Sequence, residues 1–249
     1  MSWIPSYKKP SSGGGGYTPP SWADGTDEEI VEALEKHYAG EVDLHDYWSV
    51  GDERVVSLSS MSSAGDNPHV AQDVVFVLSN VGGKYLDDGV TECCFQVDQK
   101  NSLKESDSMN YSNTNTGGWK DCKLRTWCNN TYYNAIPSTI RPIFKQFINQ
   151  SGLGNYYTSG VVSTTDYFAL RAEIEIFGTN TMSVADEGTQ VKWYETSSNR
   201  IKLRNGSDYP WWERSPRSGY YWFCYVGYGG TTDAGSADDS NGVAPFGCI

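Results

Sequence analysis

Two short stretches decide how the C-terminal part of the chain folds: WWERSP at 211–216 and NGVAPF at 241–246. Between and beside them lie many rings, because residues 209–228 contain nine aromatic side chains in twenty positions. No single period accounts for all of them, although alternation over 221–226 would bury one half of these residues and expose the other. We therefore expect a strand here, flanked by loops that present aromatic side chains.

The aromatic stretch runs into a segment of small polar residues, GYGGTTDAGSADDSNG at 227–242. Tyr combined with Ser, Gly, Asp, Thr and Asn is typical of antibody binding loops. There Tyr supplies rigid contact area at low entropic cost, and the small residues supply adaptable hydrogen bonds. The alternative is an ordinary surface loop next to aromatic residues of the core. The abundance of rings beside the loop favours a binding surface.

The whole chain has 249 residues, enough for one large domain with extensions or for two small domains. It contains 26 Gly and 17 Tyr, which favours a loop-rich or β-rich protein over a helical bundle. The net charge of −12 opposes binding to nucleic acid and to anionic membrane surfaces. No apolar run is long enough for membrane insertion. The first residues lack the apolar core of a signal peptide, so we expect synthesis in a cytoplasm.

The histidine and cysteine inventory limits the chemistry. The only histidines are His37, His45 and His69, so the C-terminal body has no His for a Ser-His-Asp or Cys-His site or for a His-ligated metal. The cysteines contain no C-x-x-C pair, and we expect buried reduced thiols at Cys93, Cys94, Cys122, Cys128, Cys224 and Cys248. The sequence predicts no catalytic group, no metal and no cofactor.

The N-terminal part divides into an arm and an attachment region. Residues 1–25 contain four consecutive glycines between prolines, which describes either a disordered tail or an arm that becomes ordered on a partner. Thr26 and Glu29 form a capping box that predicts a helix over 26–39, ended by Gly40. We assign residues 26–69 to attachment and residues 70–249 to the main domain.

The main domain is predicted to be α+β, with mixed short strands, two helices and long loops. Short β-branched or apolar runs predict strands at 54–58, 74–78, 92–97 and 166–170. One helix is expected from Trp119 to Tyr133 and a second from Pro137 to Ile148, while 151–164 is expected to be a loop. Glu173 and Glu175 are two residues apart and would not share a helical face, so a paired-carboxylate glycosidase site has no support.

The stretches WWERSP, Gly219–Phe223 and NGVAPF resemble the C-terminal module of C-type-lectin-like domains. The resemblance is to gut-bacterial and phage proteins of the formylglycine-generating-enzyme-like branch. Residues 117–130, GGWKDCKLRTWCNN, resemble the helical segment of the same phage-associated domains. The resemblance covers about residues 50–249. It implies a C-type-lectin-like fold, preceded here by an extended arm and a short helix, with a display region at about 209–242.

Several proteins of this family are phage receptor-binding tips, and some are diversified by retroelements that mutate their last codons. The resemblance therefore implies a tail-tip protein that recognises a host cell-surface protein or glycan. Scaffold positions implied by the family are Trp211, Trp212, Arg214, Ser215, Pro216, Phe223, Val243, Pro245 and Phe246. Ligand-contacting positions are Tyr220, Tyr221, Trp222, Tyr225, Tyr228, Thr231, Thr232, Asp233, Ser236, Asp238 and Asp239.

The chain departs from the family in two ways. The calcium-lectin triplets are absent, and Cys122 and Cys128 lie well before the display region, unlike the Cys pair of the oxidase members. The leading hypothesis is therefore a non-enzymatic binding protein of the virion tail tip, attached to other tail proteins through its arm and forming a homo-oligomer, with a trimer favoured. One alternative is a structural virion component whose aromatic loop is buried against another subunit. Another is a glycan-acting enzyme or lectin-fold oxidase, which would need close carboxylates or a reactive Cys pair.

Overall fold

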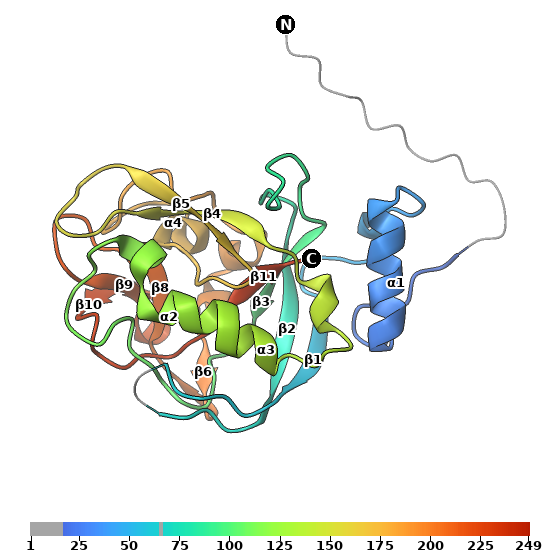
Figure 1. Cartoon of the computed structure of the whole chain (residues 1–249), viewed down its shortest axis with the longest axis horizontal. Helices are drawn as coiled ribbons and strands as arrows, with labels where there is room; N and C mark the ends of the chain where they lie inside the picture. Colours follow the sequence, from blue (N-terminus) through green and yellow to red (C-terminus); the bar gives the residue numbers. More distant parts are fainter. Residues whose placement is uncertain (1–16, 65–66) are drawn as a thin grey trace, which may run out of the picture.

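Runs of β-branched and aromatic residues form the largest sheet. The computed structural model describes residues 17–64 and 67–249 and has a mixed α+β fold of several small antiparallel sheets (Figure 1). The four strands of this sheet occur in the order β1–β2–β3–β11; they are β1 (Glu53–Leu58), β2 (Gln72–Val81), β3 (Phe95–Gln99) and β11 (Phe246–Cys248). Because β11 pairs with β3, the last residues of the chain are fixed beside its middle.

The remaining strands form three smaller antiparallel sheets. The WWERSP stretch is β8 (Trp211–Pro216), and it pairs with β9 (Phe223–Val226), which pairs with β10 (Thr232–Gly235). The other two sheets are hairpins; they consist of β4 (Phe147–Gly152) with β5 (Val161–Asp166), and β6 (Leu203–Arg204) with β7 (Ser207–Asp208). Strand β9 covers only the second part of the 221–226 stretch, and burial does not alternate along it, because Phe223, Cys224 and Val226 are all buried.

Helix α1 (Asp27–Tyr38) begins at the predicted capping box. The Glu29 amide donates to Thr26 Oγ1 at 3.3 Å, and the Thr26 amide donates to Glu29 Oε2 at 2.8 Å. The buried face of the helix consists of Ile30, Ala33 and Leu34, as its apolar spacing predicts. This face packs into the same hydrophobic cluster as the main sheet, and so α1 is part of the folded body.

The remaining helices are short. The predicted helix near Trp119 is a succession of η2 (Gly118–Asp121), α2 (Lys123–Trp127), the π-turn η3 (Cys128–Tyr132) and α3 (Tyr133–Ala135). Helix α4 is Glu173–Phe177. The short 3₁₀ turns are η1 (Leu44–Asp46), η4 (Arg141–Ile143), η5 (Lys192–Glu195), η6 (Ser197–Arg200) and η7 (Tyr228–Gly230).

Two predictions around residue 150 are wrong. The helix expected from Pro137 to Ile148 is only the turn η4, because the chain becomes extended at Phe144 and enters β4. The loop expected at 151–164 contains the end of β4 and the start of β5, so only residues 153–160 lie outside strands. The β-branched run at Val161–Thr165 pairs along its whole length with β4, and this pairing overrides the Gly- and Tyr-rich composition.

Two strand boundaries also differ from the predictions. The strand expected at 92–97 begins only at Phe95, after an isolated bridge between Tyr85 and Glu92. The strand expected at 166–170 is not continuous, since β5 ends at Asp166 and Ala169 makes a single bridge to Phe246. That bridge nevertheless ties this segment to β11, the last strand of the main sheet.

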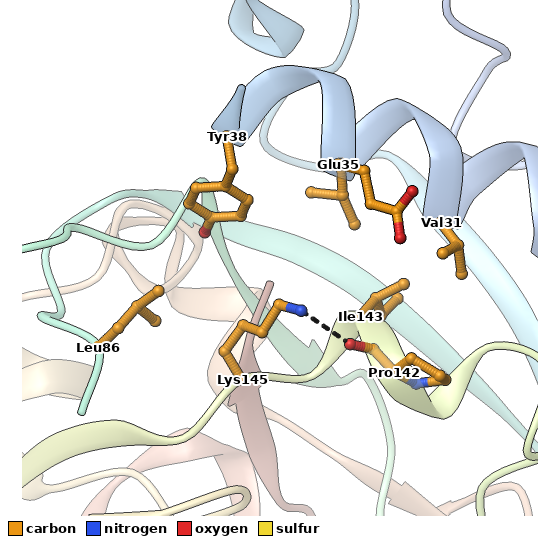
Figure 2. A pocket seen from close by; sticks show the side chains of 8 residues that line it. Val31, Glu35, Tyr38, Leu86, Pro142, Ile143 and Lys145 are labelled. Atoms are coloured by element: carbon orange, nitrogen blue, oxygen red, sulfur yellow. Dashed lines mark hydrogen bonds between the residues drawn. The ribbon is translucent and has the colours of Figure 1, made fainter. Parts of the chain in front are cut away.

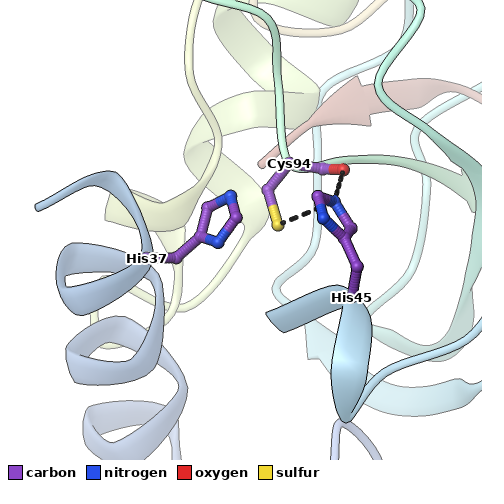
Figure 3. Close-up of side chains that lie close together, drawn as sticks. All are labelled: His37, His45 and Cys94. Carbon is purple, nitrogen blue, oxygen red and sulfur yellow. Dashed lines mark hydrogen bonds between the residues drawn. The ribbon is translucent and has the colours of Figure 1, made fainter. Parts of the chain in front are cut away.

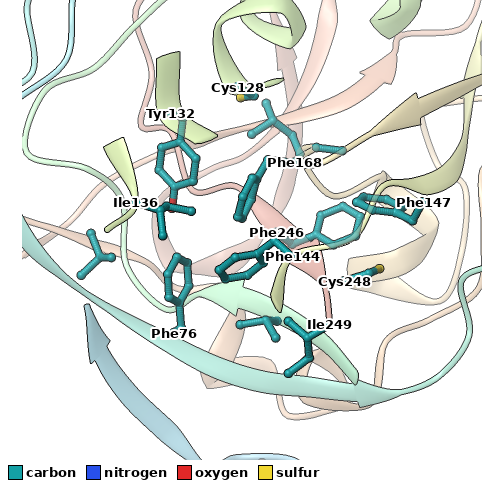
Figure 4. Close-up of a cluster of buried hydrophobic side chains, with 14 of the residues drawn as sticks. Phe76, Cys128, Tyr132, Ile136, Phe144, Phe147, Phe168, Phe246, Cys248 and Ile249 are labelled. Atoms are coloured by element: carbon teal, nitrogen blue, oxygen red, sulfur yellow. The ribbon is translucent and has the colours of Figure 1, made fainter. Parts of the chain in front are cut away.

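The core lies between the main sheet and the helical segment α2–α3. Phe76 of β2, Phe246 of β11 and Tyr132 of η3 project into one aromatic cluster, together with Phe144 and Phe168 (Figure 4). The rings of Phe144 and Phe168 are 4.7 Å apart between centroids, a favourable spacing for aromatic pairs. A separate small cluster around Tyr194 and Trp211 fixes β8 to α4 and η5.

Helix α1 and the sheet β8–β9–β10 lie at opposite ends of the long axis of the molecule (Figure 1). Residues 1–16 of the predicted arm lie outside the described residues. Residues 17–25 are described, and the Trp22 ring in this segment is buried and lies 5.5 Å from the Trp48 ring. The N-terminal segment thus reaches the body at the end remote from the predicted display region.

Candidate ligand-binding face

The nine predicted scaffold residues are all buried, as expected for structural positions. Strand β8 is buried on both faces, which is unusual for a stretch that contains Glu213 and Arg214. Trp212 donates its indole N–H to the Asp107 carbonyl at 2.8 Å, and Trp211 donates to the Arg200 carbonyl at 2.9 Å. The two Trp rings therefore hold β8 between two neighbouring segments.

Buried charges beside β8 hold the sheet against the rest of the body. Arg214 binds both carboxylate oxygens of Glu175, at 2.5 and 3.0 Å, and also donates to the carbonyls of Gln150, Leu170 and Glu187. Lys84 lies 2.6 Å from the same carboxylate. Burial alone would raise the pKa of Glu175, but Arg214 and Lys84 together hold this pKa well below its usual range.

Two other buried carboxyl groups have raised pKa values. Burial raises the pKa of Glu187 to about 7, although its Oε1 accepts from the Gly152 amide and its Oε2 from the Ser215 hydroxyl. Burial likewise raises the pKa of Glu213 well above its usual range. These carboxyl groups and Glu173 are enclosed by the chain itself, so they are structural parts of the base beneath β8 and β9.

None of the eleven predicted contact residues is buried. Tyr225 and Asp233 pair within β9 and β10, and the other nine divide between the two ends of the β8–β9–β10 sheet. One group lies where β9 begins and β10 ends; it consists of Tyr220, Tyr221, Trp222, Ser236, Asp238 and Asp239. The other group lies where β9 ends and β10 begins; it consists of Tyr228, Thr231 and Thr232. Since β9 has only four residues, the two ends are separated by about 10 Å.

The three aromatic residues of the first group belong to what we call the Tyr221 end, defined as residues 217–222 and the facing loop 153–158. The exposed fractions of Tyr220 and Tyr221 are 45% and 37%, and those of Tyr156 and Tyr157 on the facing loop are 58% and 56%. The rings of Tyr156 and Tyr221 are 6.0 Å apart. The Tyr221 end is therefore an aromatic surface assembled from two loops.

A cation lies within this aromatic surface. The guanidinium group of Arg217 is 4.2 Å from the centroid of the Tyr220 ring and 5.2 Å from that of Trp222. Guanidinium stacking restricts the mobility of a ring and keeps the charge at the surface. Arg217 thus gives the Tyr221 end a positive group in an acidic protein.

Asn115 positions both loops of the Tyr221 end. Its buried Nδ2 donates to the carbonyls of Tyr220 at 2.9 Å and Trp222 at 2.6 Å, and its Oδ1 accepts from the Asn155 amide at 2.7 Å. Asn155 and Tyr156 have positive φ values of 49° and 65°, which non-glycine residues rarely adopt. The backbone that presents the exposed tyrosines is therefore held by defined contacts.

The residues in the middle and at the other end make more internal contacts. The Tyr225 hydroxyl donates to Asp233 at 2.9 Å across the β9–β10 pair. The Thr232 hydroxyl donates to the buried carboxylate of Glu173 at 2.8 Å. Tyr228, which is 65% exposed, lies 6.4 Å from the ring of Tyr209. Of the aromatic residues among the eleven, Tyr220, Tyr221 and Tyr228 are thus the ones whose rings are exposed to solvent.

Sequence reasoning missed Tyr156, Tyr157, Arg217 and Asn115. Residues 153–160 have the same Gly, Ser and Tyr composition as the display region, and this was the available signal. Their proximity to Tyr221 depends on the β4–β5 hairpin, which the sequence did not predict. Loops 153–158 and 217–222 are far apart in the sequence, and nothing in the sequence indicates that they lie side by side in the fold.

A second surface feature lies at the other end of the molecule. It is a largely apolar groove of about 350 Å³ between α1 and the body, with Val31, Leu34 and Tyr38 on one side and Ile143 and Lys145 on the other (Figure 2). Lys145 donates to the Pro142 carbonyl at 3.1 Å. The groove is remote from the Tyr221 end and is separate from the predicted display region.

All six cysteines are free and buried, as predicted for reduced thiols. Burial raises the pKa of Cys122 to about 12, which keeps this thiol protonated at neutral pH. Within the described part of the chain, no helix combines the length and apolar character needed to cross a bilayer.

The fold and the candidate site together define a mixed α+β protein whose C-terminal sheet carries exposed aromatic loops on a buried ionic base. A family model described as a domain of unknown function, DUF6273, matches residues 97–249. This match covers more than half of the chain, which therefore belongs to the DUF6273 family. It includes β8–β11 and both loops of the Tyr221 end. No curated protein and no solved structure matches the chain.

Proposed function

We propose that the chain is a non-enzymatic receptor-binding protein of a phage tail tip and that it recognises a host cell-surface protein or glycan through the Tyr221 end. The observation that carries the proposal is the group of four exposed tyrosines held by Asn115 on two loops. Exposed rings gain contact area on binding and lose little side-chain freedom. Their rigid support reduces the entropic cost of binding.

The phage setting rests on the resemblance of WWERSP and NGVAPF to C-type-lectin-like domains of tail-tip proteins. The mixed α+β architecture is compatible with a C-type-lectin-like fold, which we propose for residues 70–249. We further propose that the display residues are diversified by a retroelement. The composition of residues 220–240 supports this, since Tyr, Asp, Ser, Thr, Gly and Ala predominate there.

The arrangement of the two ends of the molecule supports attachment at one end and receptor recognition at the other. Helix α1 and the N-terminal segment lie opposite the β8–β9–β10 sheet (Figure 1). An arm that binds other tail proteins at that end would leave the Tyr221 end free to contact a cell. A homotrimer would present three such ends, and several weak contacts would then act together as avidity.

Binding of the labelled full-length protein to bacterial host cells tests this proposal. We expect saturable binding that is lost in Tyr220→Ser/Tyr221→Ser and is retained in Tyr228→Ser, which alters the opposite end of β9. Loss only in Tyr228→Ser would move the site to the other end of the sheet. Absence of binding by folded wild-type protein on every host tested would favour a structural virion component.

A further inference from the structure

Three side chains with metal-ligating atoms converge beside the last turn of α1 (Figure 3). His37 belongs to α1, His45 to η1, and Cys94 immediately precedes β3. One ring nitrogen from each histidine and the Cys94 Sγ lie within 4.8 Å of one another. His37 and His45 are near each other in the sequence and Cys94 is distant from both, and the display region contributes nothing to the cluster.

The contacts of His45 make its Nε2 the ring nitrogen available to a cation. Its Nδ1 lies 2.8 Å from the Asp43 carboxylate, and its Nε2 lies 3.2 Å from the Cys94 carbonyl oxygen and 3.8 Å from the Cys94 Sγ. A neutral imidazole has one N–H and satisfies only one of two acceptors on opposite sides. A ring that donates from Nδ1 to Asp43 leaves the Nε2 lone pair free for a metal, which is the usual second-shell arrangement of metal-bound histidine.

The donor set and the separation of one ligand pair fit zinc, and the wider separations, up to 4.8 Å, have to shorten when the ion binds. In a tetrahedral zinc site, bonds of about 2.3 Å to sulfur and about 2.0 Å to nitrogen place these two atoms about 3.6 Å apart. The observed separation of Cys94 Sγ and His45 Nε2 is 3.8 Å. A thiolate with two imidazoles favours zinc-type ions over magnesium or calcium, which prefer oxygen ligands.

Metal binding at this position costs two hydrogen bonds, one of which is the contact of His45 Nε2 with the Cys94 carbonyl oxygen. The Leu44 amide donates to His37 Nδ1 at 3.3 Å. Binding through Nδ1 replaces this bond, and binding through Nε2 moves the ring proton to Nδ1, so the bond is lost in either case. Both hydrogen bonds are long, at 3.3 and 3.2 Å, and the metal–ligand bonds offset their loss.

We propose that His37, His45 and Cys94 form a binding site for a zinc-type divalent cation that joins the end of α1 to the start of β3. Asp43 orients His45, and water enters from the exposed side of His45 to complete the coordination. Binding releases the Cys94 thiol proton. No electron transfer is involved. The site is independent of the function proposed for the Tyr221 end.

Titration of the chelator-treated full-length protein with Co²⁺ and with Zn²⁺ tests the site. We expect one equivalent of Co²⁺ to bind with a thiolate-to-cobalt charge-transfer band. The band should disappear in Cys94→Ser and persist in Cys224→Ser, which removes an equally buried thiol from β9. We expect Zn²⁺ affinity to fall at least tenfold in His45→Gln and in His37→Gln.

Two results would overturn the proposal. One is the absence of stoichiometric Co²⁺ and Zn²⁺ binding by the wild-type protein. The other is unchanged affinity in His45→Gln, a variant at an exposed position that preserves folding even where Cys94→Ser does not. Hydrogen exchange gives a second measure, since bound Zn²⁺ should slow exchange of the amides over 27–46 in the wild type and not in His45→Gln.

Discussion

Single buried charges determine how firmly the binding face is supported. Arg214 makes five hydrogen bonds to Glu175 and to three backbone carbonyls, all in the interior. Removing one partner of such a network leaves the remaining groups desolvated and unpaired. The resemblance marked Arg214 only as a scaffold position. Its partners come from segments whose meeting depends on the tertiary fold.

Replacing Arg214 should be strongly destabilising. We expect Arg214→Met to lower the free energy of unfolding by about 3–5 kcal/mol, because the Glu175 carboxylate loses its bidentate partner. The control is Lys192→Met, which breaks the exposed ion pair with Glu195 and should cost less than about 1 kcal/mol. Urea unfolding at neutral pH measures both. Equal small losses would mean that Arg214 is not structurally important.

Glu187 should make stability depend on pH. Its pKa is about 7 in the folded protein and 4.5 for a free glutamate side chain, so between these values the folded state retains a proton that the unfolded state has lost. The contribution of Glu187 to the free energy of unfolding is fully present below about pH 4.5 and is lost as the pH rises through about 7. The loss amounts to at most about 3 kcal/mol.

The variant Glu187→Gln removes this ionisation. We expect its free energy of unfolding to fall less than that of the wild type between pH 5 and pH 8, as measured by urea unfolding at each pH. Glu213 has a raised pKa too and contributes in the same direction to both proteins. Identical pH dependences would show that Glu187 does not titrate in this range.

At the scale of elements, the sequence predicted the helices and strands that local residue patterns alone determine. The Thr26–Glu29 box marked the start of α1, and the β-branched runs marked β1 and β2. The β4–β5 hairpin was missed because its strands are specified by pairing with each other and by the Leu86–Phe147 bridge. Pro142 suited the first turn of a helix, but it forms part of a 3₁₀ turn.

The close approach of η2 to β4 explains why a glycine stands at position 118. Gly118, at the start of η2, has a φ of 60°, and a Cβ built there would lie 2.0 Å from the Gly152 carbonyl oxygen at the end of β4. Gly206 in the β6–β7 turn has a φ of 82°, and nothing lies within 4 Å of its Cβ position. Both positions disfavour L-residues, and only Gly118 also has a steric conflict.

These two glycines form a matched pair. We expect Gly206→Ala to cost about 1–2 kcal/mol from the left-handed backbone alone. Gly118→Ala should cost about 1–3 kcal/mol more, because η2 and β4 must separate to admit the methyl group. Thermal and urea unfolding of both variants measure the difference. A loss in Gly118→Ala no greater than in Gly206→Ala would show that this contact does not restrict packing.

At the scale of the whole molecule, the chain separates a proposed attachment end from a proposed recognition end. The resemblance implied Tyr220, Tyr221 and Tyr228 as contact residues, and all three are exposed. Neither the resemblance nor the composition revealed that nine of the eleven candidates divide between two ends of a sheet. They also did not reveal that Tyr156 and Tyr157 join only one of these ends. Both facts depend on strand order and hairpin pairing.

The most direct test of the central claim is a binding isotherm of the full-length protein on host cells, measured with matched tyrosine variants. Tyr220→Ser/Tyr221→Ser removes two rings from the Tyr221 end. Tyr47→Ser/Tyr85→Ser removes two rings that are 50% and 55% exposed elsewhere. We predict that affinity falls about tenfold or more in the first variant, since Tyr is a typical hot-spot residue, and is unchanged in the second. Equal affinities of the wild type and both variants, with circular dichroism confirming the fold, would contradict the assignment of the Tyr221 end as the receptor site.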